Sequence, residues 1–258
     1  MSHADPKPGF EAEWRARFER FARAFDDEPR ISGWSDTGLR RRVAAFSALL
    51  PGLGLPERAS VLELGCGGGT YVRLLGGLGY RTVGLDYSVP SLQRAVTADP
   101  GRKGLYLAGE AYRLPFAPGS FDLVVSIGVL QALSAPAHAL AEMNRVMRPG
   151  AVLVVEALNG QGAVSLARHV IQRLRGWPTK VRAYRPAEVR SWLAAEGLRL
   201  ERQPALRLPP RQAPWLGGIL EARPVRAVLD AVPPLGSAAT HSFLFVARRQ
   251  GVPRGAAR

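Results

Sequence analysis

The chain has 258 residues, of which 47% are hydrophobic, and its 35 Lys and Arg outnumber its 21 Asp and Glu by 14. This apolar content supports a buried core and excludes disorder of the whole chain, and no run of about 18 apolar residues is present to span a bilayer. The single cysteine, Cys66, excludes a disulfide framework and a thiolate metal cluster, and the N-terminus lacks the apolar segment of a signal peptide. We therefore expect a globular cytoplasmic protein with no metal site.

Five aromatic residues recur at intervals of three or four near the N-terminus: Phe10, Trp14, Phe18, Phe21 and Phe25. That spacing places them on one face of a helix. The charges between them are mixed in sign, which favours a helix packed on the domain over a basic helix lying on a membrane. A second helix is expected over 36–50, ended by Pro51 and Gly52. Residues 1–52 are thus predicted to form a helical cap on a domain spanning 53–258.

From residue 60 onwards, short apolar runs alternate with segments of helix length. This alternation is typical of βαβ units and a parallel sheet. The helix before the sixth run is expected over 185–196, and the seven prolines of 204–236 predict an insertion between the last two strands. The fold class is therefore α/β, with a doubly wound, mostly parallel sheet of seven strands. The expected strands are 61–64, 82–85, 105–107, 121–126, 152–156, 198–201 and 242–246.

A glycine-rich segment, Glu63-Leu64-Gly65-Cys66-Gly67-Gly68-Gly69-Thr70, directly follows the first strand. Glycines there allow a tight turn and let a ligand approach the backbone. Asp86, at the end of the second strand, is placed to accept hydrogen bonds from ribose hydroxyls. A dinucleotide site would have a third glycine in place of Thr70. Glu63 would repel a pyrophosphate but attract an ammonium, so the pattern favours S-adenosylmethionine over NAD.

Five motifs in this order and spacing resemble those of the class I S-adenosylmethionine-dependent methyltransferases, in particular the type 11 methyltransferase domain group. The resemblance covers about 100 residues in the middle of the chain and implies a Rossmann-like fold. It also implies that the strand near Ser242–Val246 runs antiparallel between the fifth and sixth strands. The motifs are the glycine segment from Val61 to Gly69, Val83–Ser88, Gly109–Phe116, Ser120–Val124 and Arg145–Gly150.

The resemblance also implies roles for single residues in binding S-adenosyl-L-methionine. Asp86 would hold the ribose hydroxyls, and Tyr87 would lie against the adenine. Glu110 stands where the family usually has Asp and would accept a hydrogen bond from the adenine amino group, while Ala111 would contribute its backbone N–H. The methionine part would be held by Glu63, Gly65, Cys66, Gly67 and Gly69, with Ser126 or Ile127 beside its amino-acid end.

No catalytic residue follows from the sequence. Methyl transfer needs aligned partners, and it needs a general base only when the nucleophile must lose a proton. Many relatives carry His where this chain has Gln131, and Gln cannot act as a base near neutral pH. His169 and Tyr184 are the remaining candidates for a base.

The excess of positive charge lies in the last two fifths of the chain. Residues 160–258 carry 17 basic and five acidic side chains, a net charge of +12. An Arg-rich composition is enough to explain this excess. The alternative explanation is a basic face that binds an acidic substrate, an anionic membrane surface or nucleic acid. The 160–182 segment is expected to face the substrate, and its arginines with Trp177 and the insertion's Trp215 suit an acceptor with an anionic and a flat apolar part. Ordinary packing accounts for them equally well.

Taken together, the motifs predict an enzyme that transfers a methyl group to O, N or C of a small-molecule or lipid-like acceptor. The alternative is an RNA or protein methyltransferase that uses the basic C-terminal part. A base-amino methylase motif is absent after the fourth strand, where Ser126-Ile127-Gly128-Val129 stands, and no RNA-binding module is apparent. A third alternative, a non-catalytic S-adenosylmethionine-binding protein, is disfavoured by the intact glycine segment and Asp86.

Overall fold

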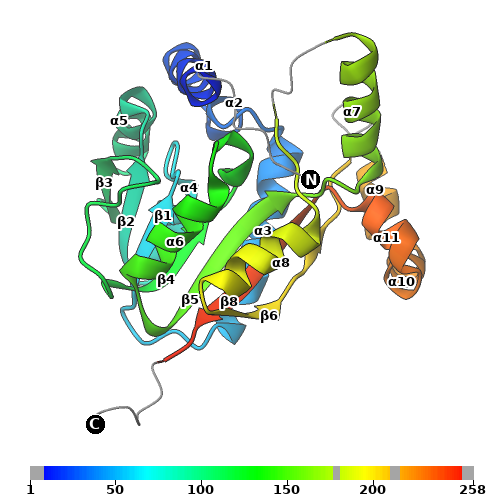
Figure 1. Ribbon diagram of the computed structural model, residues 1–258. Coiled ribbons are helices and arrows are strands. Elements are labelled where there is room, and N and C mark those ends of the chain that lie inside the picture. Colours follow the sequence, from blue (N-terminus) through cyan, green and yellow to red (C-terminus); the bar gives the residue numbers. More distant parts are fainter. Residues whose placement is uncertain (1–8, 177–180, 210–215, 252–258) are drawn as a thin grey trace.

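One eight-stranded sheet forms the centre of the computed structural model, which describes residues 9–176, 181–209 and 216–251. Its strand order is β3-β2-β1-β4-β5-β8-β6, with the two-residue β7 paired to β8 off this path (Figure 1). The strands are β1 Ser60–Leu64, β2 Arg81–Asp86, β3 Gly104–Ala108, β4 Phe121–Ser126, β5 Met147–Leu158, β6 Leu198–Arg202, β7 Ala205–Leu206 and β8 Ser242–Arg249.

The strands β1 to β5 pair in parallel, and β8 is antiparallel to both of its neighbours. In the register, Val246 lies opposite Val154 of β5, and Ala247 lies opposite Leu200 of β6. The expected fold class and the antiparallel final strand between the fifth and sixth strands are therefore confirmed. The structure adds one strand, β7, to the expected seven. Its two residues are too few to show an alternating hydrophobic pattern in the sequence.

Helices cover both faces of the sheet. In Figure 1, α6 and α8 lie on the near face, where Leu140 and Met143 of α6 join the core with Val189 of α8. On the other face, Phe46 of α3 packs edge-on against Tyr71 of α4. The helices are α1 Phe10–Ala24, α2 Glu28–Ile31, α3 Asp36–Leu49, α4 Thr70–Gly77, α5 Val89–Thr97, α6 Pro136–Val146, α7 Ala163–Leu174, α8 Pro186–Ala195, α9 Leu216–Glu221, α10 Arg223–Ala231 and α11 Pro233–Ala239, with 3₁₀ turns η1 Leu50–Gly52 and η2 Leu130–Ala132.

The Pro-rich insertion contains three short helices that the sequence analysis did not predict. Proline was interpreted there as a sign of an irregular connection. Pro224 and Pro233 instead stand in the first turn of α10 and α11, where a backbone N–H has no helical partner and its loss costs little. Residues 210–215, with Trp215, and residues 177–180, with Trp177, lie outside the described residues.

A buried ion pair joins α3 to the middle of the sheet. Nε of Arg42 donates to both carboxylate oxygens of Glu156 on β5, at 3.0 and 2.9 Å, and the hydroxyl of Ser242 donates to the same carboxylate at 2.6 Å. Burial raises the pKa of Glu156, but the charge and hydrogen bonds of Arg42 outweigh it and hold the pKa below its usual range. The pair therefore ties the N-terminal helices to β5 as a charged unit.

Replacing Arg42 by Ala should lower the free energy of unfolding by about 3–5 kcal/mol, because it leaves the Glu156 charge buried and uncompensated. Chemical denaturation at neutral pH measures this loss. Arg40→Ala, at an exposed position of the same helix, is the matched control and should cost little. Because the pKa of Glu156 is depressed, the pair's contribution is complete above the unfolded pKa of about 4.3 and is lost as pH falls through the folded value. An Arg42→Ala protein as stable as the control would contradict this role.

Candidate active site

The turn after β1 is built on glycines with left-handed backbone. Gly65, Gly67 and Gly69 have φ values of 74°, 51° and 82°, a region that costs little only without a Cβ. The backbone N–H groups of Gly65 and Cys66 both donate to the carbonyl oxygen of Leu85, at 2.7 and 3.2 Å. The glycine turn is therefore fixed to the end of β2.

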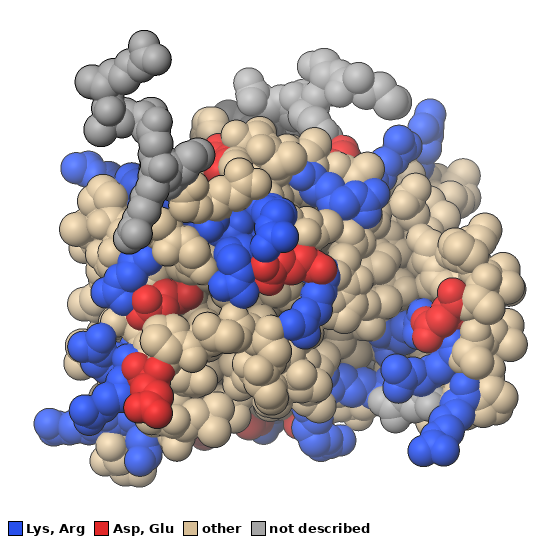
Figure 2. All heavy atoms as spheres, turned by 90° about the horizontal axis from the view of Figure 1, so that it is seen from below, with Lys and Arg blue, Asp and Glu red and all other residues tan. Residues whose placement is uncertain are grey.

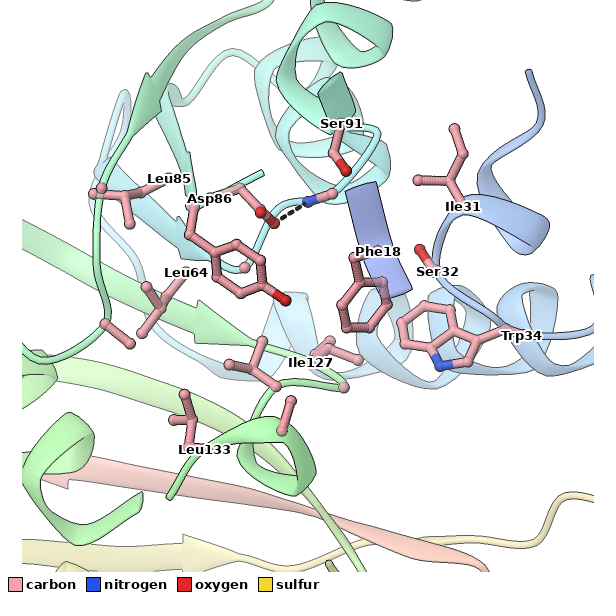
Figure 3. A pocket seen from close by; sticks show the side chains of 18 residues that line it. Phe18, Ile31, Ser32, Trp34, Leu64, Leu85, Asp86, Ser91, Ile127 and Leu133 are labelled. Atoms are coloured by element: carbon pink, nitrogen blue, oxygen red, sulfur yellow. Dashed lines mark hydrogen bonds between the residues drawn. The ribbon is translucent and has the colours of Figure 1, made fainter. Parts of the chain in front are cut away.

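Asp86, the last residue of β2, faces this turn. Its carboxylate accepts a hydrogen bond from the backbone N–H of Gly67 at 2.9 Å (Figure 3). It also accepts one from the backbone N–H of Ser88 at 2.8 Å. Burial raises the pKa of Asp86, and these two N–H groups offset only part of that effect. A carboxylate has about four acceptor positions, so two remain for further donors such as ribose hydroxyls.

A cavity opens between the glycine turn, the ends of β2 and β4, and the N-terminal helices. Its walls include five of the residues predicted to bind the cofactor: Gly65, Gly67, Asp86, Tyr87 and Ala111. Figure 3 shows Phe18, Ile31, Ser32 and Trp34 closing it on the side opposite Asp86. Half of the ten predicted residues thus lie around one space.

Three other predicted residues lie behind the glycine turn and do not line this cavity. Glu63 accepts a hydrogen bond from the N–H of Val72 in α4, at 2.8 Å. Cys66 is buried against Val72 and Leu92. Gly69 is the N-cap residue that precedes α4, and a Cβ there would crowd Tyr106. Their observed contacts shape and support the turn.

The N-terminal helix α1 lies across the mouth of the cavity. The guanidinium of Arg15 stands over the ring of Tyr87, 4.6 Å from its centroid, and pairs with Glu110. Glu11 accepts hydrogen bonds from the Ser134 N–H, at 2.7 Å, and from the Tyr112 hydroxyl. The sequence analysis placed an aromatic face on this helix but gave no signal that its charged residues reach the site.

Two buried hydroxyls at the site have no hydrogen-bond partner within the described part of the chain, those of Tyr87 and Ser126. Ser126 ends β4, next to the cavity-lining Ile127 and Gly128. A carboxylate with open acceptor positions, an aromatic ring, the backbone N–H of Ala111 and orphaned hydroxyls form a donor and acceptor set that fits an adenosine joined to an amino acid. The residues present therefore fit S-adenosylmethionine.

A second cavity of about 290 Å³ adjoins the first, and the two share Phe18, Ser32 and Trp34 as walls. The amide nitrogen of Gln131 donates to the carbonyl of Gly128 at 2.7 Å, whereas its buried oxygen has no partner among the described residues. Burial and the nearby Arg42 lower the pKa of His241 to about 4, so its imidazole is neutral at pH 7. The remaining walls include Trp14, Arg17, Arg42, Leu158, Val164, Arg168, Val181, Leu208 and Pro209.

The two candidate bases from the sequence lie elsewhere. His169 is exposed on α7 and lines neither cavity. Tyr184 is in the core, where its hydroxyl donates to the carbonyl of Leu130 at 3.0 Å and burial raises its pKa to about 12. We therefore assign neither a part in proton transfer.

Comparison with known proteins identifies the family. A family model described as a methyltransferase domain matches residues 62–155. The chain is 32% identical over 178 residues to a demethylmenaquinone methyltransferase of Roseiflexus sp. (strain RS-1), a match that covers 67% of this chain and 69% of that protein. The chain belongs to the S-adenosylmethionine-dependent methyltransferases. The sequence-based identification, the enzymatic activity and the cofactor S-adenosylmethionine are thereby confirmed.

Two further relatives belong to the same family. A malonyl-acyl-carrier-protein O-methyltransferase of Pseudescherichia vulneris is 33% identical over 143 residues, which is 55% of this chain and 52% of that protein. A ubiquinone biosynthesis O-methyltransferase of Thiobacillus denitrificans is 30% identical over 156 residues, which is 55% of this chain and 65% of that protein. The chain thus spans between about half and two thirds of the length of these two relatives.

Solved structures share the fold at low sequence identity. The magnesium protoporphyrin IX methyltransferase of Synechocystis PCC 6803, solved with bound S-adenosylhomocysteine, superposes with a TM-score of 0.64 at 15% identity, covering 93% of this chain and 100% of that one. The cyclase SpnF also superposes, with a TM-score of 0.60 at 18% identity, covering 82% and 81%. Because this fold also supports a cyclase, the sequence relatives and not the fold identify the reaction. Within the described residues, no helix is both long and apolar enough to cross a membrane.

Replacing Asp86 by Ala should weaken S-adenosylmethionine binding roughly ten- to a hundredfold, because hydrogen bonds to a charged acceptor are worth about 1.5–3 kcal/mol. Isothermal titration calorimetry on the folded variant measures this loss. Asp26→Ala, which removes an exposed carboxylate, is the control and should bind as the wild type does. An unchanged dissociation constant in a folded Asp86→Ala protein would refute the ribose assignment.

Cofactor affinity should also depend on pH. Ribose hydroxyls that donate to Asp86 stabilise its ionised form, so bound cofactor lowers a pKa that burial has raised in the free protein. Affinity should therefore increase as pH rises through the pKa of the free protein and become constant above it. Calorimetry across the acidic range tests this; a pH-independent affinity over the same range would show that Asp86 does not titrate with binding.

Proposed function

We propose that this methyltransferase acts on a small, flat, largely apolar acceptor that carries a hydroxyl group and occupies the second cavity. The observation that carries this proposal is the position of that cavity. It shares Phe18, Ser32 and Trp34 with the cofactor cavity, so ligands in the two spaces would meet across these side chains. Methyl transfer needs such an arrangement, because nucleophile, methyl carbon and sulfur must align.

The lining of the cavity supports a planar ring. Trp14, Phe18 and Trp34 present aromatic surface, and the Trp34 ring is held by the guanidinium of Arg42, 4.5 Å from its centroid. Glu156 neutralises that guanidinium, so this part of the wall is fixed without a free charge. Aromatic surface of this kind suits a planar ring, and polar walls such as Gln131, Arg168 and His241 can orient the substituents of that ring.

The names of the relatives favour the same class of acceptor. Two of the similar proteins are a demethylmenaquinone methyltransferase and a ubiquinone biosynthesis O-methyltransferase. For this chain we infer an acceptor of the quinol type, with a hydroxylated ring and an apolar substituent. Arg168 lines the cavity and pairs with no acidic side chain of the described residues, so an anionic substituent would have a partner there.

In this mechanism the chain's residues bind, orient and exclude water. The bound cofactor supplies an electrophilic methyl group. Asp86 would hold the ribose hydroxyls, Tyr87 the adenine face and Ala111 an adenine nitrogen through its N–H, which fixes the sulfonium end near Ser126. The free amide oxygen of Gln131 would accept the hydrogen bond of the acceptor's hydroxyl and so direct an oxygen lone pair toward the methyl carbon.

His241 would contribute a neutral hydrogen-bonding group to this cavity. With a pKa of about 4 it is a weak base at neutral pH, and we do not assign proton removal to it. The hydroxyl would attack as the neutral group while it donates to Gln131, and the protonated ether so formed, a strong acid, would then release its proton to solvent. Positioning and not a general base therefore supplies the catalysis. In this proposal Gln131 orients the acceptor, whereas Asp86 and Tyr87 bind the cofactor.

Replacing Gln131 by Leu should lower kcat/KM for a hydroxylated acceptor about tenfold, because one buried hydrogen bond of the acceptor is lost. The affinity for S-adenosylmethionine should not change. Gln161→Leu, at an exposed position, is the control. Equal kcat/KM in the Gln131→Leu protein and the control would remove Gln131 from the acceptor site.

The function itself is tested by measuring S-adenosylhomocysteine release with naphthoquinols and catechols as acceptors, against the same rings without a hydroxyl. Turnover with the hydroxylated rings alone is expected. Turnover confined to RNA or protein substrates would contradict the proposal.

A further inference from the structure

The helix α7 contacts α11 and presents an apolar face that is largely exposed among the described residues. None of its twelve residues is buried, and Val170, Ile171 and Leu174 are 55%, 48% and 81% exposed. In Figure 1 the helix projects from the body of the molecule, beyond the end of β5. Exposing an aliphatic face to water costs free energy. We therefore expect a binding partner to cover this face of the helix.

The sequence of α7 arranges this face as one continuous stripe. At 100° per residue, its apolar side chains fall within an arc of about 160°, and twelve residues extend it over about 18 Å. Arg168 and Arg173 stand at the two edges of the arc, and the opposite side holds Ser165, His169 and Gln172. The residues of the stripe are Ala163, Val164, Leu166, Ala167, Val170, Ile171 and Leu174.

The charge around the stripe selects the kind of occupant. Residues 161–182 contain four Arg and one Lys and no Asp or Glu. The face of the molecule seen from below in Figure 2 differs, because there basic and acidic side chains are intermixed. A helix with an aliphatic face, arginines at both edges and no acidic residue matches the anionic surface of a lipid bilayer, which offers acyl chains beneath negative headgroups.

We propose that α7 docks this protein on anionic membranes, lying in the plane of the headgroups with its apolar stripe inserted. The helix also connects this surface to the proposed acceptor cavity, because Val164 and Arg168 line that cavity. A lipophilic acceptor could then pass from the bilayer to the cavity along one edge of α7. The docking surface itself does not depend on the identity of the acceptor.

Sedimentation with vesicles tests the proposal on the full chain. Wild-type protein should bind vesicles made of equal parts phosphatidylcholine and phosphatidylglycerol, bind phosphatidylcholine alone more weakly, and lose affinity as salt is raised.

Ile171→Asp with Leu174→Asp should reduce binding to the mixed vesicles at least tenfold, since two charges replace inserted aliphatic groups. Leu78→Asp, at a 59% exposed apolar residue after α4, should bind like the wild type. Arg173→Glu should weaken binding by about fivefold or more, in line with the contribution of one basic residue near an anionic surface.

Absence of vesicle binding by the wild type, or equal binding by the Ile171→Asp/Leu174→Asp protein, would overturn the proposal. So would light scattering that shows a stable dimer which the double variant disperses, because a second copy would then cover the stripe. Neither Ile171 nor Leu174 lines a cavity. Turnover of a water-soluble acceptor should therefore be kept in the double variant, which separates failure of docking from failure of the proposed methyl transfer.

Discussion

The structure of the site depends on how the glycine turn is held to the end of β2. Two N–H groups of the turn converge on the carbonyl of Leu85, and the N–H of Gly67 donates to Asp86. This arrangement requires left-handed backbone at Gly65 and Gly67, and a Cβ on Gly65 would overlap Val129. Because β1 and β2 are parallel neighbours in exact register, both carboxyl ends meet at one edge of the sheet, and the cofactor cavity lies there.

A second constraint connects the flanks to this edge. The buried pair of Arg42 and Glu156 fixes α3 on β5, and the same guanidinium lies over Trp34. Trp34 in turn packs against Gly128, at a position where only a glycine leaves room for its ring. The wall between the cofactor cavity and the proposed acceptor cavity is therefore an extension of the core, and one ion pair supports both stability and the shape of the site.

The cofactor half of the site could be predicted from the sequence because its residues are local. The glycine segment and Asp86 follow successive strands, so the hydrophobic pattern and the spacing together placed them at one edge. The acceptor cavity could not be predicted in this way. Trp34, Gln131, Arg168 and His241 come from four distant segments. Only the packing of the N-terminal helices on the domain and the position of α7 beside α11 bring them together. The hydrophobic periodicity of the sequence cannot single out one residue such as Gln131. Its proposed role rests on a buried amide oxygen that has no partner among the described residues.

The two most informative departures from the sequence analysis have physical explanations. Proline is common both in loops and in the first turn of a helix, so the prolines of α10 and α11 were interpreted as part of a loop. The role of the charged residues of α1 could not be predicted from the sequence. Arg15 contacts Tyr87 and Glu110, and Glu11 contacts Ser134. These partners lie more than seventy residues away along the chain. In contrast, the amphipathic pattern of α7 can be seen in the sequence, but only the structure shows that its apolar face is exposed and is not part of the core.

The central claim is that the two adjoining cavities are the cofactor and acceptor halves of one active site. A crystal structure of the chain with S-adenosylhomocysteine tests it most directly. The account predicts ribose hydroxyls on Asp86, adenine against Tyr87 and the sulfur directed at the cavity lined by Trp34 and Gln131. A ligand bound away from Asp86, or one whose sulfur faces away from that cavity, would contradict it.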